Sequence, residues 1–254
     1  LAKQFDLTYR NAANVRNELN DMANYSNDVA VNTRGLQESM VAIGKSLGSN
    51  AMLNEKDLIT FTKLREQAGY TNEELVGIQK ITLATGGTLE KNSKSFLGTV
   101  ARLNAQNKLS INAKQLLKEV ANVSDAIKLS VGGTTEKLAE AAFKARQFGI
   151  NLEQADRISE SLLNFESSIE NQLKAQLLTG KQLNLEQARY AALTGDQVTL
   201  TREISNQVGS LANFQGMNVI AQKSLAEAFG MSRDEMADML QKQEVFNKYN
   251  SHDR

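Results

Sequence analysis

The sequence predicts an all-α protein made of short to medium helices, joined by glycine-containing turns and packed as a bundle or an irregular array. Its 254 residues include no proline, which is the strongest helix breaker. Apolar residues recur at steps of three and four, the period of an amphipathic helix. Alternating β-branched runs and Asn-Gly turns, which indicate strands and hairpins, are missing. Together these observations favour helices throughout.

The helical period is clearest in the middle of the chain. The row Leu116, Val120, Val123, Ile127 and Val131 gives one apolar stripe and predicts a single helix there. Two further stripes follow, at Leu138, Ala142, Ala145 and Phe148, and at Phe165, Ile169, Leu173 and Leu177.

Helix ends are marked by glycines and capping residues. In three places a turn glycine stands two residues before an N-cap, and Glu or Gln follows the cap three positions later, the pattern of a capping box. The turn glycines are Gly69, Gly149 and Gly230, and the caps are Thr71, Asn151 and Ser232. The pentapeptide Asn-Leu-Glu-Gln-Ala at 151–155 recurs at 184–188, which predicts a fourth cap at Asn184. Each cap is expected to contribute about 1 kcal/mol.

Composition divides the chain into three segments. Residues 1–50 form an asparagine-rich helical segment, 51–164 a helical region with frequent caps, and 165–254 a second helical region with its own sequence character. The chain starts at Leu1 without a signal-peptide pattern. We interpret it as a piece of a longer polypeptide.

Charge and composition exclude several classes of protein. Lys and Arg number 29, as do Asp and Glu, so the formal net charge is zero and predicts no nucleic-acid recognition. Cysteine is absent and there is one histidine, which excludes a disulfide scaffold and the usual zinc or haem ligand sets. No apolar run is long enough to span a membrane. We expect no cofactor and no metal.

No catalytic constellation is evident. Gly44-Lys45-Ser46 resembles the end of a phosphate-binding loop, but Ser39 occupies the position that requires glycine. Carboxylate pairs such as Glu136 and Glu140 fit solvated helix faces better than an acid/base pair. We therefore expect no enzyme.

The last forty residues are rich in methionine and phenylalanine. Such faces can be adaptable binding surfaces, and Met217, Phe229, Met236 and Met239 form the candidate interaction face. The same helical spacing also fits an ordinary core, which is the commoner outcome.

Residues 165–246 carry a family resemblance. The stretches Ser-Ile-Glu-Asn-Gln-Leu-Lys-Ala at 168–175 and Leu-Thr-Gly-Lys-Gln-Leu-Asn at 178–184 resemble tail tape measure proteins of large tailed bacteriophages. So do Ala-Glu-Ala-Phe-Gly-Met-Ser at 226–232 and Ala-Asp-Met-Leu at 237–240. These motifs are structural rather than catalytic and cover about a third of the chain.

The resemblance implies a virion protein inside the phage tail, made in the host cytoplasm, that helps to set tail length and leaves before DNA ejection. It also implies self-association, in a multiple of three, and contact with tail tube and baseplate hub proteins. The closely spaced caps indicate a compact module rather than one extended rod. The alternative is a soluble helical adaptor or chaperone-like interaction module, with the methionine-rich end as its groove.

Overall fold

The computed structural model describes residues 8–47, 54–131 and 134–251, and these form fifteen α-helices and no strand. The predicted all-α class is therefore confirmed. The chain divides into two compact units, one of Leu1–Ser95 with Leu117–Asn122, the other of Phe96–Leu116 with Val123–Arg254. This division follows packing and differs from the three segments drawn from composition.

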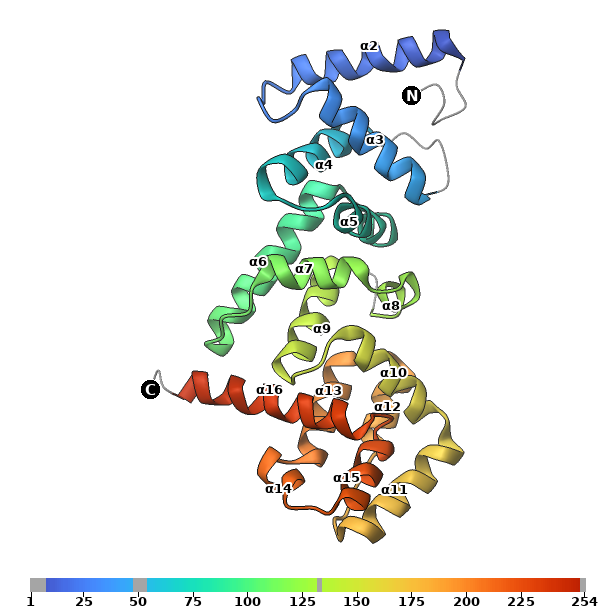
Figure 1. Cartoon of the computed structure of the whole chain (residues 1–254), viewed down its shortest axis with the longest axis vertical. Coiled ribbons are helices and arrows are strands. Elements are labelled where there is room, and N and C mark those ends of the chain that lie inside the picture. The colour runs from blue at the N-terminus through green and yellow to red at the C-terminus, as the bar shows by residue number, and fades with distance from the viewer. Residues whose placement is uncertain (1–7, 48–53, 132–133, 252–254) are drawn as a thin grey trace. The chain divides into compact units, whose positions relative to one another are not determined.

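The first unit is built from consecutive antiparallel or crossing helices (Figure 1). It contains α2 (Tyr9–Tyr25), α3 (Thr33–Leu47), α4 (Glu55–Ala68) and α5 (Asn72–Thr85), with the start of α6 (Leu89–Asn107) and the end of α7 (Ala113–Asn122).

Its core forms where α3, α4 and α5 meet. Leu36, Phe61 and Leu75 are completely buried, because each lies on the apolar side of its own helix. A polar link accompanies them, since the hydroxyls of Ser39 and Thr62 lie 2.9 Å apart in the interior. Helix α2 covers α3 with a narrow apolar side of Val15 and Leu19.

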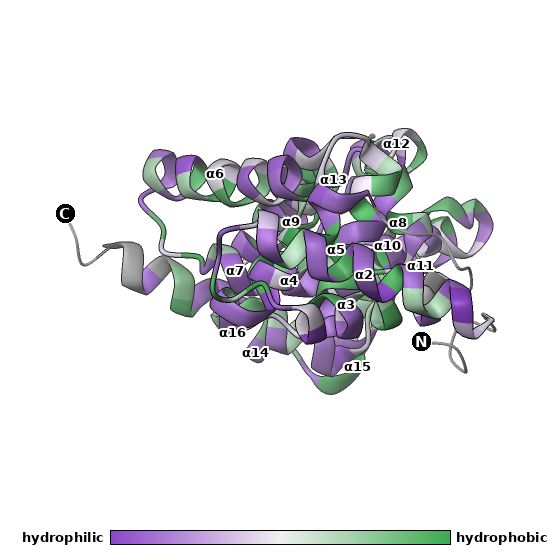
Figure 2. Cartoon of the chain, turned by 90° about the horizontal axis from the view of Figure 1, so that it is seen from above, coloured by the Kyte–Doolittle hydropathy of each residue, from purple (hydrophilic) through white to green (hydrophobic). Residues whose placement is uncertain are grey.

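The second unit holds most of the remaining helices. They are α8 (Asp125–Ser130), α9 (Thr135–Gln147), α10 (Leu152–Leu163), α11 (Phe165–Thr179), α12 (Glu186–Thr194), α13 (Gln197–Val208), α14 (Leu211–Gln215), α15 (Val219–Ala228) and α16 (Arg233–Ser251). Figure 2 shows hydrophobic and hydrophilic residues interspersed along individual helices, as short amphipathic helices require.

Small residues hold two helices of this unit close together. Helix α11 packs on α15 (Figure 1). The buried residues of α11 are Ser168 and Ala175, and those of α15 include Ala221, Ser224 and Ala228. Because the distance between packed helices depends on the side chains at their contact, this composition allows a close approach.

The predicted turn glycines all have left-handed backbone angles. Gly69 ends α4 with φ 66°, and Gly149 and Gly230 have φ 80° and 66°. At two of them space is also restricted. A Cβ on Gly149 would lie 2.4 Å from the carbonyl oxygen of Met239, and one on Gly230 would lie 2.3 Å from the Cβ of Ser161. Glycine is therefore required there by conformation and by packing.

Three of the four predicted caps lie at helix starts. Thr71 and Asn151 are the N-caps of α5 and α10, each with a complete capping box. Ser232 and Glu235 exchange the same two bonds before α16, at 3.1 and 2.9 Å.

The prediction for Asn184 is wrong by one residue. The N-cap of α12 is Leu185, which has no side-chain capping bond, and Asn184 instead accepts a bond from the N–H of Glu186 at 3.1 Å. Leu183 and Leu185 are both buried. Their burial holds 183–185 outside the helix and leaves Asn184 between them on the surface side.

The stripe from Leu116 to Val131 does not belong to one helix. Helix α7 ends at Asn122, and α8 begins after Ser124, whose hydroxyl accepts the N–H of Ile127 at 3.3 Å. The apolar period continues across this break, so spacing alone could not reveal it. The serine cap supplies the local reason for a new helix start.

Candidate interaction surface

No cluster of potential metal ligands occurs among the described residues. Within the same ranges, no helix has the length and apolar character needed to cross a bilayer. The run Gly44-Lys45-Ser46 lies inside the continuous helix α3, whereas a phosphate-binding loop needs irregular backbone before its helix. Grooves and exposed apolar faces are the remaining candidates for a functional surface.

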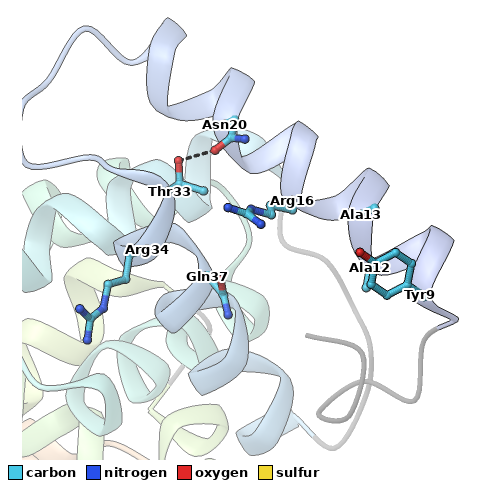
Figure 3. Close-up of a pocket in the computed structure, with 8 residues that line it drawn as sticks. All are labelled: Tyr9, Ala12, Ala13, Arg16, Asn20, Thr33, Arg34 and Gln37. Carbon is cyan, nitrogen blue, oxygen red and sulfur yellow. Dashed lines mark hydrogen bonds between the residues drawn. The ribbon is translucent and has the colours of Figure 1, made fainter.

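A groove of about 570 Å³ lies between α2 and α3. Arg16 extends from α2 toward α3, whereas Arg34 points away from Arg16 (Figure 3). Arg34 already pairs with Glu38 at 3.0 Å, and its side chain is largely exposed. A hydrogen bond of 2.7 Å from Thr33 to Asn20 links the two helices at this groove. Because the two guanidinium groups do not converge, the groove does not form a defined anion site.

The interaction face predicted near the C-terminus is mostly core. Phe229, Met236 and Met239 are buried, and Met217 is half-buried. For these three residues the core interpretation, which the spacing favoured, holds, and the alternative of an exposed interaction face does not. The physical reason is the turn at Gly230, which folds α16 back on α15 and brings their apolar sides together.

An exposed apolar row lies on α11. Four residues at steps of four form what we call the α11 row, with exposed fractions of 50% for Phe165, 47% for Ile169, 54% for Leu173 and 86% for Leu177. Leu178 beside it is 42% exposed. Isolated exposed apolar residues are common on proteins, but a contiguous row is typical of an interaction site.

Hydrogen bonds from a neighbouring helix fix the orientation of α11. The buried Arg189 of α12 donates from Nε to Ser168 Oγ at 3.0 Å and from a terminal nitrogen to Gln172 Oε1 at 2.7 Å. Burial lowers the pKa of the Arg189 guanidinium, and the charge of Glu186 opposes that effect. Gln172 and Gln176 also donate to the carbonyl oxygen of Leu183, at 2.6 and 2.7 Å.

These bonds fix which side of α11 faces outward. Ser168, Gln172 and Gln176 occupy the polar edge next to the row and bond to Arg189 and to the carbonyl oxygen of Leu183. The row itself stays about half-exposed or more among the described residues. Sequence periodicity identified the row but not its exposure. Arg189 was missed entirely, because a single arginine in a helix usually indicates a solvated face.

Charges flank the α11 row on one side. Glu166 and Glu170 are exposed near the start of the helix, and neither forms an ion pair within the described part of the chain. Lys174 follows one turn later and pairs with Glu227 of α15 at 3.3 Å. Glu227 has a second partner, Lys223, at 3.7 Å. The flank therefore changes from acidic to basic along α11.

Comparison of the chain with protein-family models, with curated proteins and with solved structures finds no match in any of the three. The fold and surface define an all-α helical array that bears an exposed apolar helix face.

Proposed function

We propose that this chain is a structural assembly module of a phage tail tape measure protein, without catalytic activity. In this role it lies in the tail tube or baseplate region, helps to set tail length and leaves before DNA ejection. The observation that carries the proposal is the α11 row, because a protein that acts by assembly needs an exposed apolar surface for its partners. The row falls within residues 165–246, where the sequence resembles that family.

The proposed partners are other copies of this chain, in a multiple of three, and tail tube and baseplate hub proteins. The neutral net charge supports protein partners rather than nucleic acid. The adaptor alternative loses the methionine-rich groove on which it depended, since Phe229, Met236 and Met239 are buried. It keeps only the α11 row as a binding surface.

The test is an in-frame deletion of residues 1–254 from the full-length gene, followed by electron microscopy of tails. A fully helical segment of this length would extend about 380 Å at 1.5 Å per residue. Shortening by that amount supports an extended ruler segment. Loss of tail assembly without any shorter tails supports the compact module that the helical turns indicate. Particles of normal length and infectivity would contradict the proposal.

A second measurement separates virion protein from adaptor. Mass spectrometry of purified particles should find peptides of this chain in the tail, in stoichiometric amounts. Finding the chain only in the soluble fraction of infected cells would favour the adaptor. The matched control is a tail tube protein followed in the same fractions.

A further inference from the structure

The geometry of the α11 row points to a second copy of this chain as its occupant. We propose that two copies associate through α11, with the two helices running antiparallel. This inference needs only the isolated chain and does not rest on the virion role. An assembly of six copies made of three such pairs would also satisfy a multiple of three.

The row has a shape that can pack against itself. Phe165, Ile169, Leu173 and Leu177 lie four residues apart, so they form one continuous ridge along the helix. Ridges of this kind fit into the equivalent grooves of another helix at a crossing angle of about −50°, the commonest helix packing in globular proteins. In a pair of copies, the ridge of each helix would lie in the groove beside the ridge of the other.

The charges select the antiparallel direction. When two identical helices pair antiparallel, the charged flank of one helix meets the charged flank of the other. A two-fold axis close to Leu173 then places Glu170 of each copy level with Lys174 of the other. In a parallel pair the charged flank would instead meet the opposite flank, which carries the neutral Gln172 and Gln176. Only the antiparallel pair gains two symmetry-related ion pairs.

The bond between Lys174 and Glu227 leaves Lys174 available. Its side chain is 53% exposed, so a second carboxylate can approach it from solvent. If Lys174 turned fully toward the other copy, Glu227 would keep Lys223 as a partner. Glu170, which has no ion pair among the described residues, gains one in the complex.

The size of the row sets the expected affinity. A helix face of this kind offers apolar area of a few hundred Å² per copy, comparable with the largest patch on ordinary monomers. Stable complexes bury about 800 Å² per partner. We therefore expect a reversible dimer with a dissociation constant on the order of micromolar.

The first experiment is sedimentation equilibrium of the 254-residue chain over a wide concentration range. The wild-type chain should show a monomer–dimer equilibrium. Leu173→Glu places a charge at the centre of the contact and should weaken association at least about tenfold. The matched control is Leu83→Glu, because Leu83 is 61% exposed on α5 and lies outside the row. Circular dichroism checks that both variants fold.

The control should associate like the wild type. A wild-type chain that stays monomeric at all concentrations would overturn the proposal. So would a Leu173→Glu variant that dimerises as tightly as the wild type.

The second experiment tests the direction. Glu170→Lys places like charges opposite each other twice and should weaken the antiparallel dimer about tenfold at low salt. Adding Lys174→Glu to that variant reverses both charges and should restore association. A parallel pair predicts little effect from either change.

Cysteine cross-linking measures the same direction independently, because the chain contains no cysteine. Position 173 lies near the two-fold axis, so the Leu173→Cys variant should form a disulfide between position 173 of one copy and position 173 of the other. Phe165→Cys should not, since the two positions would be about 20 Å apart along the antiparallel pair. Efficient cross-linking through both positions, or a trimer in sedimentation, would overturn the antiparallel pair.

Discussion

The carboxylate of Asp57 in α4 accepts a hydrogen bond of 3.0 Å from the backbone N–H of Leu89, the first residue of α6. The other carboxylate oxygen accepts from the Asn54 side chain at 2.8 Å, and Asn54 caps the backbone of Asp57 in return. Asp57 is buried. One side chain therefore links the starts of two helices that are 32 positions apart.

Replacing Asp57 with alanine should destabilise the first unit by about 1–3 kcal/mol, because the N–H of Leu89 loses its acceptor in the interior. Asp57→Asn keeps one acceptor oxygen and should cost less. Urea unfolding followed by circular dichroism measures both. The control is Glu55→Ala, since Glu55 is an exposed acid in the same turn. Equal effects at Asp57 and Glu55 would contradict the role of the buried bond.

Alanine substitutions at two glycines measure the stability cost of backbone strain separately from that of a steric clash. Gly149 and Gly180 have similar left-handed angles, φ 80° and 69°, but only Gly149 has a close neighbour. Gly180→Ala should cost about 1–2 kcal/mol, the penalty of that conformation alone. Gly149→Ala adds the clash with the Met239 carbonyl and should cost about 3 kcal/mol or more. Denaturant midpoints report both values, and equal costs would show that the close approach is absent.

The repeated pentapeptide provides a matched pair of capping tests. Asn151→Ala removes the cap of α10 and should cost about 1 kcal/mol. Asn184→Ala removes a single bond, to the N–H of the first residue of α12, and should cost less. Gln154→Ala should also destabilise, because Gln154 accepts the N–H of Asn151 at 3.0 Å, whereas Gln187→Ala should be nearly neutral. Thermal melts of the four variants test this ranking. A larger loss of stability for Asn184→Ala than for Asn151→Ala would contradict it.

The stability effect of replacing Asp156 should depend on pH. Burial, together with the nearby charge of Glu160, raises the pKa of Asp156 above its usual 3.8. The charged form is thus disfavoured in the folded state, and the resulting penalty is absent below pH 3.8 and complete above the raised pKa. Asp156→Asn should therefore stabilise the protein at pH 7, by a few tenths of a kcal/mol because the site is half-exposed and screened.

The gain from Asp156→Asn should fade as the pH is lowered through the raised pKa toward 3.8. Stability curves at several pH values measure it. Glu153→Gln is the control, because Glu153 lies in the first turn of α10, where a negative charge is favourable. A gain that stays constant with pH would contradict the assignment.

Local sequence predicted the helical class, the turn glycines and the caps at Thr71, Asn151 and Ser232. These features depend on residues within one or two turns of each other, which the sequence displays directly. The break between α7 and α8 was missed, because the apolar period continues through it.

The two copies of Asn-Leu-Glu-Gln-Ala start their helices at different positions. Five identical residues begin a helix at Asn151, but the second helix starts one residue later, after Leu185. The difference comes from the burial of Leu183 and Leu185 and from the Gln207 side chain, which accepts the N–H of Asn184 at 3.0 Å. These are contacts across the second unit that a pentapeptide does not contain.

The sequence by itself thus determined where helices form and where most of them end, because propensity, period and capping are local. Only the tertiary structure decided which apolar faces are covered. The side chains of Met236 and Met239 are buried, whereas the row from Phe165 to Leu177, with the same helical spacing, is exposed. The physical reason is that a helix buries whichever side its neighbours contact, and Arg189 together with the small residues of α15 holds the other side of α11 inward.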